Sequence, residues 1–471
     1  MKKFTRIAFV FVVMTMLFLL ISCSALNGGM PLSPSVGGGS SGGDYGDMPP
    51  MSPSGPSGSV GGDKGGFGDD VMADEPSIEG GFEEMPDIIP PDADSGDEPE
   101  VPDTDENVRL PAGMITAGAH NDNQYYSDWQ RLFEQGENEN GKFFMYTNPS
   151  YSWGFNSMNR VKVSVTNGEN AVSGASVVAA DEQGNILFSA ISDANGNAYL
   201  FTAMESGNIT VTSGDGSAAA SFDADNRDIS VNLDSCGEKR NVIEIMLVVD
   251  VTGSMGDEID FLKAELADVI NRIAENNSGA AIKLAMLFYR DTDDKVPFDY
   301  YDFTDVTTSA GMLAQQSALN LQYATGGGDY PEAVDEALDL AVNKQWSSGA
   351  TTKIIFHVLD APAHEGSKYA TKLVNATKTA AEKGIRICPI LCSGAAESTE
   401  YTMREAAVYT GGTFIFVTDD SGIGGSHHDP SLPNTTIELL NSLMVRLVNG
   451  YHTGNFEDPI YWKQDPNLNN K

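Results

Sequence analysis

The stretch that decides the fold is Val242–Met255, VIEIMLVVDVTGSM, in which a mostly apolar run leads directly into Asp250 and a short polar loop. Such a run is typical of a strand covered on both faces, as in a parallel sheet flanked by helices. Residues 256–275 follow with apolar side chains at helical spacing. The stretch therefore predicts a buried strand, a polar loop and a helix.

The same alternation continues towards the end of the chain. Apolar runs predict strands at 281–289, 297–303, 352–359, 385–391 and 413–417, and helical spacing predicts helices at 367–383, 400–409 and 435–449. Pro331 suits the first turn of a further helix that runs through Val342. The pattern predicts a doubly wound α/β domain over residues 241–452, followed by a tail at 453–471.

Polar loops follow three of these segments, at 250–255, 325–332 and 360–364. In a doubly wound sheet, ligands bind beyond the carboxyl ends of the strands, where such loops meet. The loops offer carboxylate and hydroxyl oxygens, which hard cations such as Mg²⁺ prefer. Two carboxylates brought together at helix N-termini need a cation or a proton to offset their repulsion. The sequence therefore predicts a cation site at this edge.

The first of these loops, Asp250-Val-Thr252-Gly-Ser254, resembles the opening motif of the von Willebrand factor A family. Members carry a metal-ion-dependent adhesion site that adds one residue from each of two later loops. The resemblance implies that Thr252 and Ser254 coordinate the ion directly, and that Asp250 and Asp360 hold it largely through water.

The middle loop, Gly-Gly-Gly-Asp329-Tyr-Pro-Glu, departs from the integrin-like pattern, which places a Thr there. It resembles a branch of the family that also carries Asp-x-Thr-Gly-Ser-Met and a motif like Tyr289-Arg290-Asp291. In that branch Asp329 fills the Thr position, and Thr325 is the alternative ligand. A third acidic group would make the ion less electrophilic and weaken capture of a carboxylate.

The family resemblance implies binding without catalysis. The ion is Mg²⁺, or Mn²⁺ or Ca²⁺, and an acidic residue of a protein partner fills its open position. One alternative is a metal-free scaffold in which the polar residues only cap helices. Another is a metal-dependent hydrolase using Asp360 with His364, or the cluster at 427–429. The sequence contains no HExxH, GxSxG or Walker A motif, which disfavours an enzyme.

Four cysteines, at positions 23, 236, 388 and 392, do not form a disulfide framework. A redox role for Cys388 and Cys392 is an alternative, but two residues four apart on one strand lie about 13 Å from each other, so buried thiols are favoured. Cys23 has a different explanation.

The N-terminus reads as an export signal. Basic residues precede an apolar run at 7–21, which is too short to span a membrane comfortably and suits a signal peptide at 1–22. The run ends Leu-Ile-Ser-Cys23, which resembles the lipobox of bacterial lipoproteins. That resemblance implies a lipid on Cys23 and a membrane-anchored protein at the cell surface or on the periplasmic face.

Residues 23–110 are rich in Gly, Ser, Pro and acidic residues, which predicts a disordered tether. The stretch from Ser24 to Leu110 holds 19 acidic and two basic residues, nearly half of the net charge of −39, and this acidity excludes nucleic acid as a partner. Residues 111–235 show short alternating strands, which predict an all-β sandwich similar to prealbumin-like or carboxypeptidase-regulatory-like domains. The rings around Tyr125 and Trp129 are expected to pack on the sandwich edge, and a carbohydrate-stacking surface is the alternative.

Overall fold

The computed structural model describes residues 114–136, 141–328, 330–349, 351–418, 432 and 435–469. The predicted signal peptide, tether and lipidated Cys23 lie outside these residues. In the described chain, one eight-stranded mixed sheet with helices is joined to two four-stranded sheets. None of the helices among the described residues is both long and apolar enough to cross a membrane.

The eight-stranded sheet has the order β12-β11-β10-β13-β14-β15-β1-β16. Strands β10, β11, β13, β14 and β15 run parallel, and β12 and β1 pair antiparallel with their neighbours. The strands are β1 (Thr116–His120), β10 (Val242–Asp250), β11 (Ala281–Tyr289), β12 (Phe298–Asp305), β13 (Thr352–Leu359), β14 (Ile385–Leu391), β15 (Phe414–Val417) and β16 (Glu438–Leu439).

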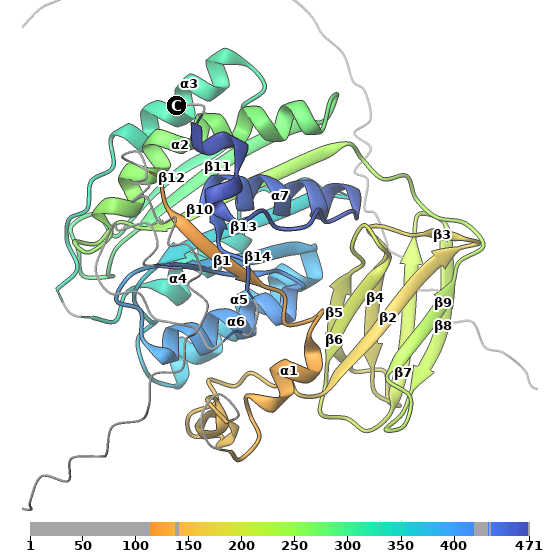
Figure 1. The fold of residues 1–471 in the computed structure, drawn as a ribbon. Helices are drawn as coiled ribbons and strands as arrows, with labels where there is room; N and C mark the ends of the chain where they lie inside the picture. The colour runs from red at the N-terminus through yellow and green to blue at the C-terminus, as the bar shows by residue number, and fades with distance from the viewer. Residues whose placement is uncertain are drawn as a thin grey trace, which may run out of the picture. The chain divides into compact units, whose positions relative to one another are not determined.

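Helices cover both faces of this sheet, as Figure 1 shows. The central strand β10 explains why: Met246 and Val248 pack towards one layer, whereas Ile245 and Leu247 pack towards the other. One layer holds α4 (Val334–Val342), α5 (Ser367–Lys383) and α6 (Glu397–Thr410), and the other holds α2 (Gly256–Asn276), α3 (Ser309–Asn320) and α7 (Leu440–Thr453). The prediction of an α/β domain is thus confirmed.

Three details differ from the sequence prediction. The final helix, predicted over 435–449, is α7 at Leu440–Thr453, and β16 at Glu438–Leu439 precedes it because these two residues pair with β1. Helix α4 begins at Val334, so Pro331 lies in the preceding loop and not in the first turn. Helix α3 was not predicted, although the side chain of Thr308 caps it by accepting a hydrogen bond from the Gly311 amide at 3.1 Å. Its apolar residues are too few and too scattered to give a clear helical stripe.

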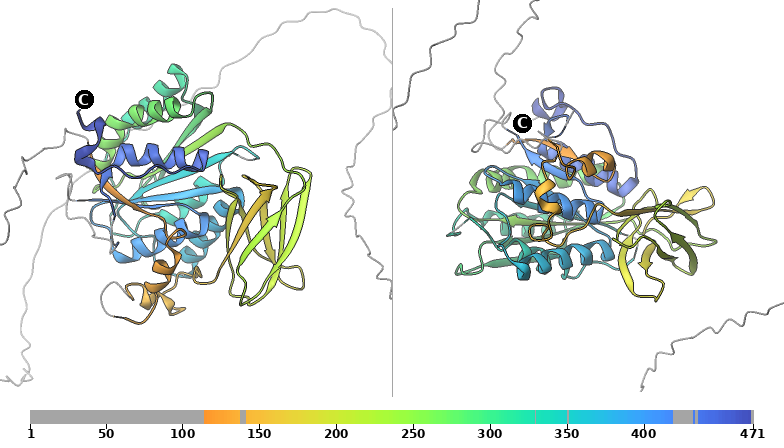
Figure 2. Two further views of the ribbon diagram at one scale, coloured as in Figure 1. Left: turned by 45° about the vertical axis from the view of Figure 1, so that its right-hand side comes forward. Right: turned by 90° about the horizontal axis from the view of Figure 1, so that it is seen from below.

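The middle of the chain forms two facing four-stranded sheets, visible beside the α/β part in Figures 1 and 2. Their strands alternate buried residues with half-buried or exposed ones, which is the pattern of a sandwich. The strands are β2 (Arg160–Asn167), β3 (Asn170–Ala171), β4 (Ser176–Ala180), β5 (Ile186–Ile191), β6 (Asn197–Phe201), β7 (Gly207–Ser213), β8 (Gly216–Phe222) and β9 (Asp228–Asn232).

The sandwich does not begin at residue 111 as predicted. Strand β1 (Thr116–His120) lies instead in the α/β sheet, where it pairs antiparallel with β15 and β16. Gly118 fits only because it lacks a side chain, since a Cβ there would lie 2.4 Å from the ring of Phe416. No local pattern in the sequence specifies a pairing partner almost three hundred residues away.

The segment between β1 and β2 packs mainly on helix α6, not only on the sandwich edge as predicted. It contains α1 (Tyr126–Arg131) and a short 3-10 turn, η1 (Phe144–Thr147). The Trp129 ring is fully buried and lies 5.1 Å from the guanidinium of Arg404 on α6. Tyr126 does lie at the sandwich edge, with the Arg160 guanidinium 3.8 Å from its ring centre.

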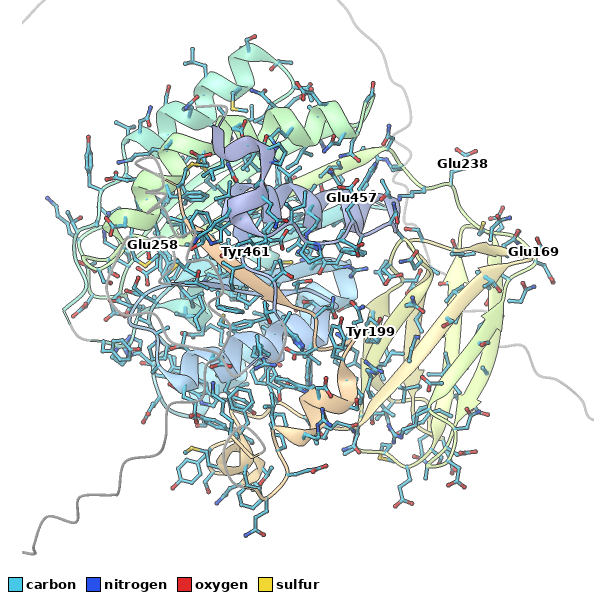
Figure 3. The ribbon with its side chains drawn as sticks, viewed as in Figure 1. Glu169, Tyr199, Glu238, Glu258, Glu457 and Tyr461 are labelled. Carbon is cyan, nitrogen blue, oxygen red and sulfur yellow. The ribbon has the colours of Figure 1, made fainter. Side chains whose placement is uncertain are left out.

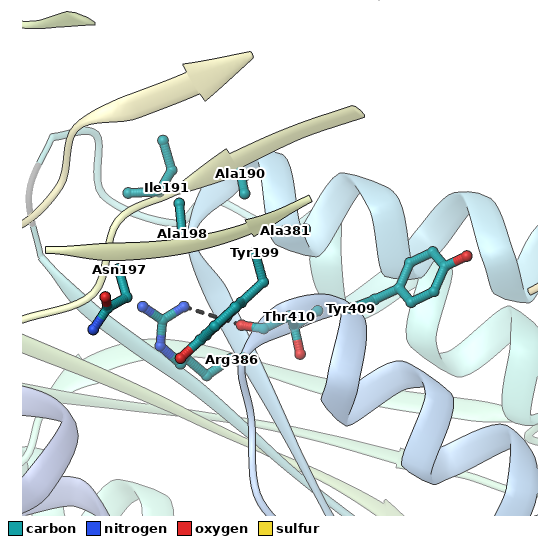
Figure 4. Close-up of a pocket in the computed structure, with 10 residues that line it drawn as sticks. Ala190, Ile191, Asn197, Ala198, Tyr199, Ala381, Arg386, Tyr409 and Thr410 are labelled. Atoms are coloured by element: carbon teal, nitrogen blue, oxygen red, sulfur yellow. Dashed lines mark hydrogen bonds between the residues drawn. The ribbon is translucent and has the colours of Figure 1, made fainter. Parts of the chain in front are cut away.

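The sandwich and α6 share one apolar core. The ring of Tyr409 lies 4.7 Å from that of Phe201 and 5.4 Å from that of Phe188. Beside them, Arg386 donates a 3.0 Å hydrogen bond to the Thr410 carbonyl and borders a cavity of only about 10 Å³ (Figure 4). A space of that size holds about one water molecule, so this junction is packed and not a ligand site. Two short 3-10 turns, η3 (Trp462–Gln464) and η4 (Pro466–Asn469), end the described chain.

Candidate metal centre

Three loops meet where strands β10 and β13 end. Strand β10 leads to α2 on one face of the sheet and β13 leads to α5 on the other, so a crevice opens between them. Backbone hydrogen bonds tie the loops together: Thr325 N to Val251 O at 3.0 Å, and Glu332 N to Pro362 O at 3.0 Å. The three loops predicted from the sequence to converge are therefore in contact.

The first loop places its oxygens around Asp250, which is fully buried. Its Oδ1 accepts hydrogen bonds from the Thr252 amide at 2.9 Å and the Thr252 hydroxyl at 2.7 Å. Its Oδ2 is also buried but has no hydrogen-bond partner among the described residues. Ser254, at the exposed end of the loop, hydrogen-bonds the carboxyl of Asp360. The structure thus brings Asp250, Thr252, Ser254 and Asp360 together.

The middle loop is described except at Asp329, which lies outside the described residues. The alternative ligand Thr325 is exposed, and its hydroxyl accepts a hydrogen bond from Arg290 at 3.5 Å. Arg290 also donates to the Thr325 carbonyl at 2.7 Å, which fixes this end of the loop. Gly326 and Gly327 adopt the left-handed region, with φ of 82° and 68°, and so turn the chain back towards the first loop.

Glu332, to which the sequence pattern assigned no role, also lies beside the first loop. Glu332 is 4% exposed, and its Oε2 has no hydrogen-bond partner among the described residues. A Cβ on Gly327 would lie 2.7 Å from Glu332 Oε1 and 3.1 Å from Thr252 Cβ, so both side chains border the same point. The sequence offered only its position in the loop, because its burial depends on the contact of that loop with Pro362.

Burial is the main cause that raises the pKa of these carboxylates, and repulsion between some of them adds to it. Burial, with a contribution from the charge on Asp360, raises the pKa of Asp250 to about 7. Burial and the neighbouring carboxylates, Asp250 first, raise the pKa of Glu332 to about 9. Burial also raises the pKa of Asp360, and raises that of Glu258 in the first turn of α2 (labelled in Figure 3) to about 7. The site is an accumulation of acidic groups that favours a positive charge.

Two further acidic residues support the loops. The Oδ2 atom of Asp294 accepts a hydrogen bond from the Gly327 amide at 3.0 Å. Asp291 Oδ1 lies 2.7 Å from Nε2 of His364. The carboxylate that hydrogen-bonds His364 is therefore Asp291. The hydrolase alternative pairs His364 with Asp360, and the structure does not support that pairing. The other histidines of that alternative, His427 and His428, lie outside the described residues.

The donor set fits a hard divalent cation. No three His, Cys, Asp or Glu residues in the described ranges form a metal-binding group on their own. The set here mixes carboxylates with the hydroxyls of Thr252 and Ser254, and two buried carboxylate oxygens, on Asp250 and Glu332, lack partners. An unpaired buried carboxylate oxygen is costly, and Mg²⁺ takes oxygen ligands of this kind while retaining water.

The thiols of Cys388 and Cys392 are free and buried, as favoured from the sequence. Burial raises the pKa of Cys388 to about 11, so it carries little thiolate at neutral pH. Neither is suited to redox exchange with solvent.

Comparison with known proteins agrees with this description of the α/β part. Residues 244–419 match the family model described as von Willebrand factor A domain. The von Willebrand factor A domain-containing protein 7 of Mus musculus is 36% identical over 98 residues, 21% of this chain and 10% of that protein. The alpha-protein kinase vwkA of Dictyostelium discoideum is 24% identical over 132 residues, 27% of this chain and 19% of that protein.

The chain therefore spans a fifth or less of the length of either curated relative. Among solved structures, the open conformation of the pilus adhesin SpaC from Lactobacillus rhamnosus GG is 12% identical and covers 44% of this chain and 29% of that chain, with a TM-score of 0.29. Because this TM-score is low, the similarity to a known family is taken from the match to the family model alone. Residues 244–419, which form most of the α/β part, are therefore similar to the von Willebrand factor A domain.

Proposed function

We propose that the protein binds a protein partner through a divalent cation held at the carboxyl end of β10 and β13. The observation that supports this most is the pair of buried carboxylate oxygens without partners, Asp250 Oδ2 and Glu332 Oε2, beside the hydroxyl of Thr252. Such oxygens are costly to bury unless a cation or proton joins them.

The residues proposed to hold the cation are Asp250, Thr252, Ser254 and Asp360, with Asp329 from the middle loop and Thr325 as its alternative. Glu332 adds a further carboxylate from the floor of the site. The cation, Mg²⁺ or else Mn²⁺ or Ca²⁺, would supply a Lewis-acidic position for an acidic side chain of the partner.

This chain's own residues set how that position is presented. Asp250 orients Thr252 by accepting both its amide and its hydroxyl, so the hydroxyl lone pairs stay available for the cation. Ser254 is exposed and so marks the side from which a partner would approach. The additional carboxylates reduce the net positive charge at the cation, which makes recognition depend on neighbouring contacts as well.

The first experiment measures the cation. Titration of the purified protein with Mg²⁺ and Mn²⁺ by calorimetry is expected to show one site that Asp250→Ala and Ser254→Ala remove. The control is Asp257→Ala, which removes an exposed carboxylate from the first turn of α2. Equal binding by wild type and Asp250→Ala would refute the proposed site.

The second experiment measures the partner. Envelope extracts are passed over immobilised protein with Mg²⁺ or with EDTA, and proteins retained only with Mg²⁺ are identified. Asp250→Ala is expected to retain none of them. Retention that is the same with EDTA and with Asp250→Ala would favour a metal-free scaffold, whereas metal-dependent release of a hydrolysed product would favour an enzyme.

We also propose that Cys23 carries a lipid that anchors the protein to the cell envelope. The support is the lipobox-like end of the apolar run at 7–21, and more than one acyl chain is needed for stable attachment. Metabolic labelling with palmitate is expected to mark the wild-type protein and not Cys23→Ser. Labelling of both would refute the assignment.

A further inference from the structure

A groove of about 870 Å³ lies between the segment around η1 and the N-terminal ends of α5 and α6. One wall carries the rings of Tyr146, Tyr151 and Trp153. The other carries residues at the start of α5, including Ser367 and Thr371. Its volume is within the range of small-molecule sites, and it is separate from the proposed cation ligands.

The aromatic wall is fixed in place and partly open to solvent. Tyr146 is held by parallel stacking on Tyr401, with ring centres 4.0 Å apart, whereas Tyr151 is 54% exposed. Trp153 has φ of 53°, and it is the one non-glycine residue with positive φ in the described ranges. A large side chain rarely adopts this region, and such strain persists only where the surroundings impose it.

The polar lining is uncharged apart from one carboxylate. Ser150, Ser367 and Thr371 are exposed, and their hydroxyls form no hydrogen bond with other residues in the part of the chain that the structure describes. Glu365 is the one carboxylate of the lining, which contains no Lys, Arg or His among its described residues. An anionic ligand would therefore meet a negative charge without a compensating positive one.

We propose that this groove binds a short, uncharged oligosaccharide. The ring of a sugar has flat C–H faces that pack on aromatic side chains, and a rim of hydroxyls that pairs with hydroxyl and carboxylate groups. Both kinds of group line this groove. A peptide that binds by adding a strand to a sheet would instead need a free strand edge, and helix ends and loops form these walls.

The test begins with an array of uncharged oligosaccharides built from glucose, galactose, mannose and N-acetylhexosamines, probed with the full-length protein. The strongest binder is then titrated by calorimetry. Tyr151→Ala is expected to weaken binding about tenfold, because a stacked ring is lost, and Thr371→Ala severalfold. The matched control is Tyr461→Ala, a partly exposed tyrosine outside the groove (labelled in Figure 3).

Oligosaccharide binding in this groove does not depend on the proposed cation site. It is expected to persist in EDTA and in Asp250→Ala, so loss of oligosaccharide binding can be distinguished from loss of cation-dependent partner binding. No binding to any uncharged oligosaccharide at millimolar concentration would overturn the proposal. So would equal affinities for wild type, Tyr151→Ala and Trp153→Ala, or binding of acidic oligosaccharides alone.

Discussion

Glu405 on α6 allows a quantitative prediction about pH and stability. This side chain is 1% exposed, its Oε1 accepts a 2.9 Å hydrogen bond from the Ser157 hydroxyl, and its Oε2 has no hydrogen-bond partner among the described residues. Burial raises the pKa of Glu405 from 4.5 to about 8. At neutral pH the folded protein therefore holds a proton here that the unfolded chain releases.

The direction in which stability changes with pH follows from the difference between the folded and unfolded pKa of Glu405. Because the folded pKa lies above the unfolded one, stability is fully present below pH 4.5 and is lost as pH rises towards 8. Each pH unit in this window costs about 1.4 kcal/mol, so the loss between pH 4.5 and pH 7 is about 3 kcal/mol. Glu405→Gln stays neutral at every pH and so removes this pH-dependent loss of stability.

The assay is chemical denaturation of both proteins at pH 5, 6, 7 and 8. The stability of Glu405→Gln relative to wild type is expected to rise by about 1.4 kcal/mol per pH unit up to pH 7, and by less between pH 7 and 8, where the folded wild type also begins to lose the proton. Other titrating groups cancel in the difference. Any cost of burying the amide nitrogen is a constant offset. Glu382→Gln, at an exposed position on α5, is the control variant and is measured at the same four pH values. A difference between Glu405→Gln and wild type that does not change with pH would refute the reasoning.

Three further predictions concern the cation site and the α6 interface. At Mg²⁺ a hundredfold above its Kd, thermal unfolding of wild type should show about 2.7 kcal/mol of stabilisation that Asp250→Ala lacks, and an equal gain in both would contradict the site. Arg404→Ala should cost about 3–5 kcal/mol in denaturant unfolding, because Arg404 Nε lies 3.0 Å from the buried Asp122 Oδ2; a cost below about 1 kcal/mol would contradict this. Gly327→Ala, at φ of 68°, should lower stability by about 1–2 kcal/mol and weaken Mg²⁺ binding in calorimetry. Gly328→Ala is its control, since a Cβ there has no neighbour within 4 Å. Equal effects of the two substitutions would contradict the close contact of a Cβ at Gly327 with Glu332.

Much of the α/β domain could be predicted because its signals are local. The apolar runs at 281–289, 352–359 and 385–391 coincide with β11, β13 and β14, since strands buried on both faces must be apolar throughout. Asp250 and Asp360 could be predicted at strand ends because each comes directly after an apolar run. That the three loops meet followed from the parallel arrangement that alternating strands and helices impose.

Tertiary structure alone decided the features that depend on distant contacts. Strand β1 pairs with β15, which lies almost three hundred residues later in the chain, and the sequence of β1 does not indicate that partner. Glu332 became part of the candidate site only because its loop packs on Pro362 and buries its carboxylate. The pKa of Glu405 is likewise raised by its burial in the folded protein, even though the hydrogen bond from Ser157 lowers it. The sequence by itself determined the strands, helices and polar loops, whose patterns are written in neighbouring residues, whereas burial and charge environment arise from residues that only the folded chain brings together.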